Sequence, residues 1–88
     1  TGKTQVIKWL AKYLAHNNVS FVIISKGYGT NLKGAVMVES QHQASDVGDE
    51  AIELSDFGRV IVAKNILDAV HFIEHINPDI VLVDDGLQ

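Results

Sequence analysis

The first part of the chain carries apolar residues at helical spacing. They recur at i, i+3, i+4 and i+7, at Ile7, Leu10, Ala11 and Leu14. This stripe predicts an amphipathic helix over residues 3–16. Asn17-Asn18 follows and is expected to end the helix, because asparagine tolerates the left-handed conformation of a helix cap. Lys8 and Lys12 fall outside the stripe and are expected on the other side of the helix, and Trp9 and Tyr13 are expected to pack on each other.

A second apolar stripe predicts a helix over residues 66–76. Asn65 is placed as its N-cap, Asp68 completes a pattern like a capping box, and Asn77-Pro78 ends the helix. His71 and His75 are four residues apart on this helix, a spacing that can bind zinc. The pair lies off the apolar stripe and no third ligand is evident, so a solvated helix face is the favoured interpretation.

Shorter apolar runs predict buried strands. Three of them cover residues 19–24, 59–63 and 80–83, and a weaker candidate over residues 32–38 is interrupted by Lys33 and Gly34. A short helix is expected from Ala51 to Leu54. Because helices and strands alternate along the chain, the pattern predicts an α/β fold, a parallel sheet with helices on both faces.

Composition narrows the possible classes of protein. The chain has 88 residues, enough for one domain at most, and 47% of them are hydrophobic. Its seven lysines and arginines are scattered among eleven acids, for a net charge of −4, which argues against a nucleic-acid partner. There is no cysteine, hence no disulfide and no thiolate metal site. No apolar run approaches the roughly 20 residues of a membrane span.

Thr1-Gly2-Lys3-Thr4 matches the second half of a P-loop, the motif in which lysine reaches the phosphates and Ser/Thr binds Mg²⁺. The quartet stands at a predicted helix start, where backbone N–H groups favour an anion. A purely structural N-cap remains open at this point. The motif's first glycine and its strand would precede residue 1. We therefore expect residues 1–88 to be a single partial domain of a P-loop NTPase-like fold that lacks its first strand.

Asp84 follows the apolar run Ile80-Val81-Leu82-Val83. Four apolar residues and then an acid form the Walker B pattern, in which a strand delivers a carboxylate to Mg²⁺. Any buried strand can end in Asp, but together with Gly2-Lys3-Thr4 the Walker B interpretation is favoured. Asp85 is then either a second acid of the same site or a residue that supports the site from just outside it.

Two further segments have both a functional and a structural interpretation. Ser25-Lys26-Gly27-Tyr28-Gly29 follows a strand and is either a substrate or phosphate loop, with Lys26 as an electrostatic clamp, or a turn that needs glycine. Asp49-Glu50 precedes a short helix and is either a base or metal ligand, or a pair that complements the helix dipole. Spacing alone favours the dipole for the acids and leaves the loop open.

Taken together, these motifs resemble the tetraacyldisaccharide 4'-kinases of Gram-negative bacteria, over the whole chain. The family's segments I-S-R-G-Y-G and G-D-E-P correspond to segments that begin at Ile24 and Gly48. Its segment G-G-x-G-K-T-P appears from its third position at Thr1, and its segment D-D-G-[FL]-Q-H appears from Asp84 as far as Gln88, without the final His. Gln5 and Ala51 replace prolines of the family pattern, and Lys26 replaces an arginine, which keeps the charge but loses the bidentate fork.

The resemblance implies a kinase that transfers the γ-phosphoryl of ATP to the 4'-hydroxyl of a tetraacyldisaccharide 1-phosphate. By position, Thr1, Gly2, Lys3 and Thr4 would hold ATP, and Thr4, Asp84 and Asp85 would hold Mg²⁺. Asp49 would be the catalytic base, with Lys3 acting on the phosphates. The residues implied near the substrate are Ser25, Lys26, Gly27, Tyr28, Glu50 and Gln88. For Asp49 the resemblance reverses the interpretation that spacing favoured.

The resemblance also implies a place of action, the cytoplasmic face of the bacterial inner membrane, reached through parts of the protein outside these residues. ATP and the acylated disaccharide are the expected partners. Two alternatives stay open: another P-loop small-molecule kinase or ligase, and an inactive truncated remnant of the kinase. For the isolated 88 residues we expect little or no kinase activity.

Overall fold

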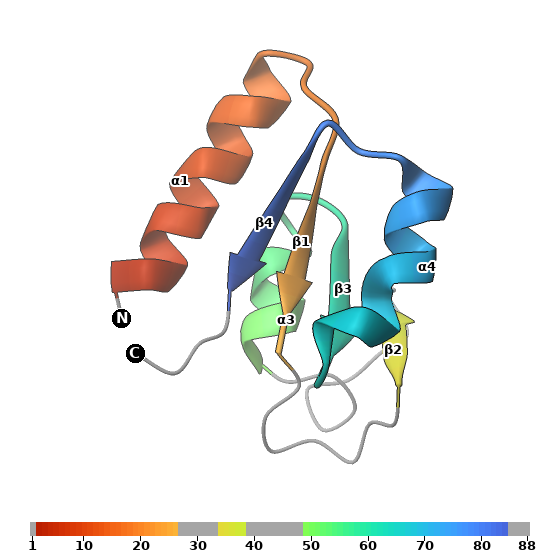
Figure 1. Ribbon diagram of the computed structural model, residues 1–88. Coiled ribbons are helices and arrows are strands. Elements are labelled where there is room, and N and C mark those ends of the chain that lie inside the picture. Colours follow the sequence, from red (N-terminus) through yellow and green to blue (C-terminus); the bar gives the residue numbers. More distant parts are fainter. Residues whose placement is uncertain (1, 27–33, 39–48, 85–88) are drawn as a thin grey trace.

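The computed structural model describes residues 2–26, 34–38 and 49–84 (Figure 1). Its elements, in chain order, are α1 (Gly2–His16), β1 (Phe21–Ser25), β2 (Ala35–Met37), α3 (Asp49–Leu54), β3 (Val60–Ala63), α4 (Ile66–Ile76) and β4 (Ile80–Asp84). Every described element was expected from the hydrophobic pattern, with boundaries that differ by a few residues. The polar segment before α3 lies outside the described residues.

The strands form one four-stranded sheet in the order β2-β3-β1-β4. β1 is central to its parallel part, because it pairs in parallel with both β3 and β4. β2 differs from the expected all-parallel sheet, since it pairs antiparallel with β3 at the edge. An antiparallel edge strand on an otherwise parallel sheet is a common arrangement. The predicted α/β class is confirmed, and the sheet is mixed.

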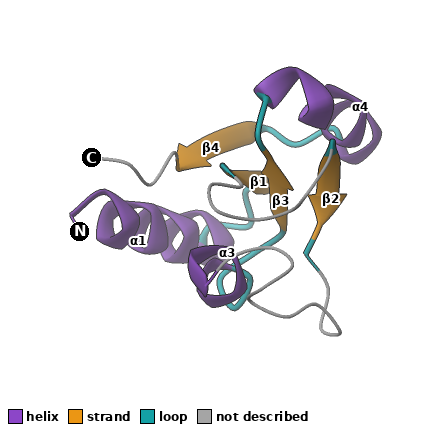
Figure 2. Ribbon diagram, turned by 90° about the horizontal axis from the view of Figure 1, so that it is seen from below, coloured by secondary structure: helices purple, strands orange, loops and turns teal. Residues whose placement is uncertain are grey.

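Helices cover both faces of the sheet, as expected (Figure 2). α1 and α3 lie on one face, where Ile7, Ala11, Ala51 and Leu54 pack with Ile23, Val60 and Val62. α4 lies on the other face, where Ala69 packs with Val22, Ile24, Ile61 and Ala63. Successive residues of a strand point to opposite faces, so the continuous apolar runs of β1 and β3 supply both cores at once.

Asparagines end both long helices. Asn18 has φ 59°, and the Val19 N–H donates to the Leu14 carbonyl at 2.9 Å while the Asn18 N–H donates to Ala15 at 3.2 Å. This is the Schellman pattern, which satisfies the last carbonyls of α1. Asn77 ends α4 in the same left-handed region, with φ 52°. The expected helix ends are confirmed.

The start of α4 is capped as predicted. The Asn65 side-chain oxygen accepts a hydrogen bond from the Leu67 N–H at 3.0 Å. Such a bond satisfies one of the N–H groups that the first helical turn leaves without a partner. Asp68 lies in the first turn of the helix, where its negative charge complements the helix dipole.

β4 departs from the expected fully buried strand. Ile80, Val81 and Val83 are 37%, 38% and 46% exposed. β4 is the last strand of the described sheet and pairs there with β1 alone. An apolar run therefore predicted the strand correctly, but its burial depends on neighbours that the run does not reveal.

Within the described residues, we find no helix that combines the length and the apolar character needed to cross a membrane.

Candidate functional site

The carboxyl ends of the parallel strands and the first turns of the helices meet at one edge of the molecule. In Figure 1 the arrowheads of β1, β3 and β4 point to the edge at which α1 and α3 begin. In open α/β sheets, ligands bind in the crevice outside the carboxyl ends of the strands. This edge, here called the carboxyl edge, is therefore where the candidate site lies.

Two polar residues are buried at the carboxyl edge. Ser25 is the last residue of β1 and 6% exposed, and Asp84 is the last residue of β4 and 3% exposed. They are partners in the parallel register, and the Lys26 N–H donates to the Asp84 carbonyl at 3.3 Å. The pairing of the two strands thus holds Ser25, Lys26 and Asp84 close together.

Asp84 is the one acidic residue among the buried residues that the structure describes. Burying a carboxylate is costly unless hydrogen bonds or charges compensate it. Within the described part of the chain, every buried side-chain nitrogen or oxygen has a hydrogen-bond partner. The end of β4 therefore holds a carboxylate in a fixed and compensated position, as a metal-binding or phosphate-proximal acid requires.

The start of α1 offers a place for an anion. Gly2, Lys3 and Thr4 form its first turn, and this turn contains no acidic residue. The first four N–H groups of a helix have no partner within the helix, and the helix dipole adds positive potential there. A helix start that carries lysine and no acid favours a phosphate, which agrees with the motif interpretation of these residues.

α3 begins at Asp49, two residues earlier than expected. Asp49 and Glu50 are therefore the first residues of the helix, where acids complement its dipole. α3 lies on the same face of the sheet as α1 and begins at the carboxyl edge (Figures 1 and 2). The fold thus brings the backbone of Asp49 to the same edge as Asp84.

The remaining predicted site residues, Thr1, Gly27, Tyr28, Asp85 and Gln88, lie outside the described residues. His71 and His75 are exposed on α4, as expected of a solvated helix face. The described residues contain no group of three or more histidines and acids able to hold a metal ion. Mg²⁺ does not require such a group, because it is usually bound by one or two carboxylates together with phosphate oxygens.

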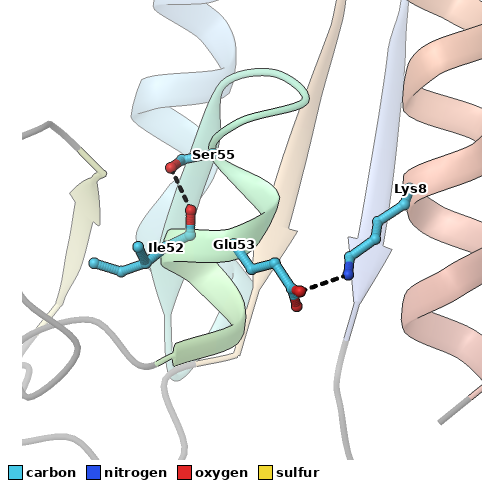
Figure 3. Close-up of polar contacts among 4 residues, drawn as sticks. All are labelled: Lys8, Ile52, Glu53 and Ser55. Carbon is cyan, nitrogen blue, oxygen red and sulfur yellow. Dashed lines mark hydrogen bonds and ion pairs between the residues drawn. The ribbon is translucent and has the colours of Figure 1, made fainter.

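One contact at this face was not anticipated. The Lys8 ammonium lies 2.8 Å from the Glu53 carboxylate of α3, and the Lys8 side chain is only 15% exposed (Figure 3). The Phe57 ring, just after α3, lies 6.0 Å from the Lys8 ammonium and 5.4 Å from that of Lys12. The expectation that Lys8 faces away from the packed side of α1 was wrong.

The reason for that error is physical. Lysine can lay its long apolar stem along a packed surface while its ammonium reaches a polar partner. Lys8 follows Ile7 directly and so stands at the border of the apolar stripe. Its partner Glu53 is far away in the sequence, and no local pattern shows such a pairing. By contrast, the expected pairing of Trp9 and Tyr13 is confirmed, since their rings stack with centroids 5.8 Å apart.

Comparison with known proteins gives a consistent result. The sequence model of the family LpxK, described as tetraacyldisaccharide-1-P 4'-kinase, matches residues 1–88. Proteins named tetraacyldisaccharide 4'-kinase from Rickettsia rickettsii (strain Sheila Smith) and Rickettsia felis are 51% and 49% identical over all 88 residues. The chain spans 27% of the length of these relatives.

A solved structure has the same fold. It is the crystal structure of an "apo" form of LpxK from Aquifex aeolicus in complex with ATP, which matches 100% of this chain and 30% of its own chain. The TM-score is 0.80 at 24% sequence identity. At this identity the likeness concerns the fold, and it agrees with the α/β architecture predicted from the hydrophobic pattern.

Proposed function

Because the chain belongs to the LpxK family of tetraacyldisaccharide-1-P 4'-kinases, we propose that the protein is an ATP-dependent lipid kinase. The reaction transfers the γ-phosphoryl group of ATP to the 4'-hydroxyl of a tetraacyldisaccharide 1-phosphate. The bond between the γ-phosphorus and the bridging oxygen breaks, ADP leaves, and the hydroxyl oxygen forms the new ester bond.

The observation that carries this proposal is the convergence at the carboxyl edge. A helix start that favours anions, in the first turn of α1, shares this edge with the buried carboxylate of Asp84. Phosphoryl transfer needs little covalent chemistry from the protein and depends on positioning and charge neutralisation. A phosphate-binding helix start and a fixed acid are the two parts that this chemistry requires.

Thr1 and the first residues of α1 hold the nucleotide. Backbone N–H groups of Thr1 and Gly2 and the Lys3 ammonium bind the phosphates of ATP, and Lys3 offsets negative charge on the transferred group. The hydroxyl of Thr4 and the carboxylates of Asp84 and Asp85 are oxygen donors of the kind that Mg²⁺ prefers. The buried position of Asp84 fits such a role. Mg²⁺ held by these groups would neutralise negative charge on the phosphates.

The start of α3 serves the acceptor. Asp49 accepts the proton of the 4'-hydroxyl as the oxygen attacks, and Glu50 lies beside it. Ser25 is the last residue of β1 and Lys26 follows it at the same edge. With Gly27, Tyr28 and Gln88 they line the substrate side of the site. The positive charge of Lys26 suits the phosphate at position 1 of the acceptor.

The place of action follows from the substrate. A disaccharide with four acyl chains resides in a membrane, and ATP is found in the cytoplasm. The protein therefore works at the cytoplasmic face of the inner membrane and meets its lipid there. No step of the reaction involves nucleic acid.

The decisive experiment is a phosphoryl-transfer assay on the protein expressed from its complete reading frame. Purified protein is incubated with γ-labelled ATP, Mg²⁺ and tetraacyldisaccharide 1-phosphate in detergent micelles, and the labelled lipid is separated and counted. Transfer to the 4'-position is expected, and Lys3→Ala is expected to lower kcat by about 100-fold or more.

The alternatives give different outcomes in the same assay. If label reaches a soluble small molecule and leaves the lipid unlabelled, the protein is a different P-loop kinase. If the folded protein transfers label to no acceptor, it is an inactive remnant. Either result overturns the proposal. An Arg59→Ala variant serves as the control, since it removes one positive charge from an exposed residue just before β3, at the end of the strand away from the carboxyl edge.

A further inference from the structure

The contact between α1 and α3 occupies a particular place relative to the proposed site. It consists of Lys8 and Lys12 of α1, and Glu53 and Phe57 in and after α3, here called the α1–α3 clasp. The ion pair of the clasp, at 2.8 Å, joins a side chain that is 15% exposed to one that is 56% exposed. Figure 3 shows Glu53 on the side of α3 that faces α1, with the Lys8 side chain reaching across.

The two residues of the ion pair, Lys8 and Glu53, each lie one helical turn after a proposed site residue. Lys8 follows Thr4 by four residues on α1, and Glu53 follows Asp49 by four residues on α3. Positions four apart lie on the same side of a helix, about one turn from each other. Since both helices begin at the carboxyl edge, the ion pair lies one turn away from the two helix positions proposed to hold phosphate and to carry the base.

The clasp is poorly explained as a device for stability alone. An ion pair with one partner largely in solvent adds little to the free energy of folding, because water screens it and ordering long side chains costs entropy. Its effect on position is a separate matter. Displacing a catalytic group by about 1 Å can lower a rate by about 100-fold. A contact that adds little to the free energy of folding can therefore have a large effect on the catalytic rate.

We propose that Lys8 and Glu53 are positioning residues that set the spacing between the phosphate-binding start of α1 and the base at the start of α3. The inference rests on the proposed function and deepens it. Phe57 supports the pair, because its ring lies within reach of both lysine ammonium groups and packs against the core under α1 and α3. Neither Lys8 nor Glu53 is proposed to touch ATP or lipid.

The test uses variants of the protein expressed from its complete reading frame. Lys8→Met and Glu53→Gln each break the ion pair, Lys8→Arg keeps it, and the double variant Lys8→Glu/Glu53→Lys restores it with reversed charges. For each we measure kcat, KM for ATP and the melting temperature. Arg59→Met and Glu74→Gln are the matched controls; Arg59 is exposed just before β3, and Glu74 is exposed on α4 at the other face.

The single variants are expected to lose about tenfold in kcat, with KM for ATP changed less than about threefold. Lys8→Arg and the reversed pair are expected to return to within about threefold of the unchanged protein. The melting temperature should shift by no more than about 3 °C. A purely structural role would instead lower the melting temperature together with the rate and would not separate kcat from KM.

Three outcomes overturn the inference. They are single variants with unchanged kcat, a reversed pair that stays as slow as the single variants, and controls that are slowed as much as Lys8→Met. If a single variant fails to fold, the reversed pair alone decides. A kcat within about threefold of the unchanged protein supports the inference, and a kcat that is still about tenfold lower overturns it. An unchanged protein without any lipid kinase activity refutes the proposed function, and this is distinguishable from an active protein that ignores the clasp.

Discussion

Ser25 and Asp84 are direct register partners at the ends of two parallel strands, β1 and β4, and both are buried although both are polar. The next backbone step extends this relationship, since the Lys26 N–H donates to the Asp84 carbonyl. The position of the carboxylate is thereby tied to the pairing of the strands. Because backbone pairing holds this position, a substitution that removes only the charge of Asp84 is expected to leave the position of its side chain unchanged.

Asp84→Asn keeps the shape of the side chain and removes its charge. If Asp84 helps to hold Mg²⁺ at the phosphates, kcat for lipid phosphorylation is expected to fall by about 100-fold or more. Steady-state kinetics over a range of Mg²⁺ concentrations measures the effect. Asp79→Asn is the control, because Asp79 is exposed and lies just before the opposite end of the same strand. Equal rates for both variants would remove Asp84 from the site.

Asp49→Asn tests the base at the start of α3. We expect a loss of about 100- to 10,000-fold in kcat, the usual range for a general base, with little change in KM for ATP. Asp68→Asn is matched to it, since Asp68 is also an acid in the first turn of a helix, on the other face of the sheet. If the two variants lose activity alike, the acid at Asp49 serves only the helix dipole.

Leu54→Ala tests the core beneath α1 and α3. Leu54 is fully buried there, so its truncation is expected to cost about 2–5 kcal/mol in the free energy of unfolding. Leu67→Ala removes the same atoms from a side chain that is 72% exposed, and its cost should stay within about 0.5 kcal/mol. Urea denaturation followed by circular dichroism compares the two, and similar midpoints would contradict the described packing.

Asn65→Ala tests the cap of α4. Its side chain accepts the Leu67 N–H, and loss of such a cap is expected to cost about 1 kcal/mol of unfolding free energy. Asn65→Asp keeps an accepting oxygen and should remain near the unchanged protein. The same denaturation experiment checks both, and a cost shared by Asp and Ala would show that the hydrogen bond is not responsible.

Much of the architecture could be predicted because it depends on local periodicity. The apolar stripe of α1 and the caps at Asn18, Asn65 and Asn77 depend on residues that are close in the sequence, and the structure has them where expected. The direction in which a strand runs in the sheet does not depend on local periodicity. The antiparallel course of β2 depends on where the chain enters the sheet, and its three residues carry no sign of it.

Some features of the candidate site could likewise be predicted from local sequence, and others could not. The position of Asp84 at the end of β4 was foreseen from an apolar run followed by an acid. The role proposed for Asp49 could not be reached from spacing, because an acid at a helix start has an equally good electrostatic reason to be there. The pairing of Lys8 with Glu53 was beyond prediction for another reason, since it joins residues that only the folded chain brings together.

The exposed apolar side chains of β4 affect the tendency of this polypeptide to aggregate in solution. Ile80, Val81 and Val83 present hydrocarbon to water on a strand that ends the described sheet. Strands of this kind invite other copies to pair with them, which leads to aggregation. Solutions of the 88-residue chain alone should therefore turn cloudy as concentration rises, and a lysine introduced by Val81→Lys should keep them clear.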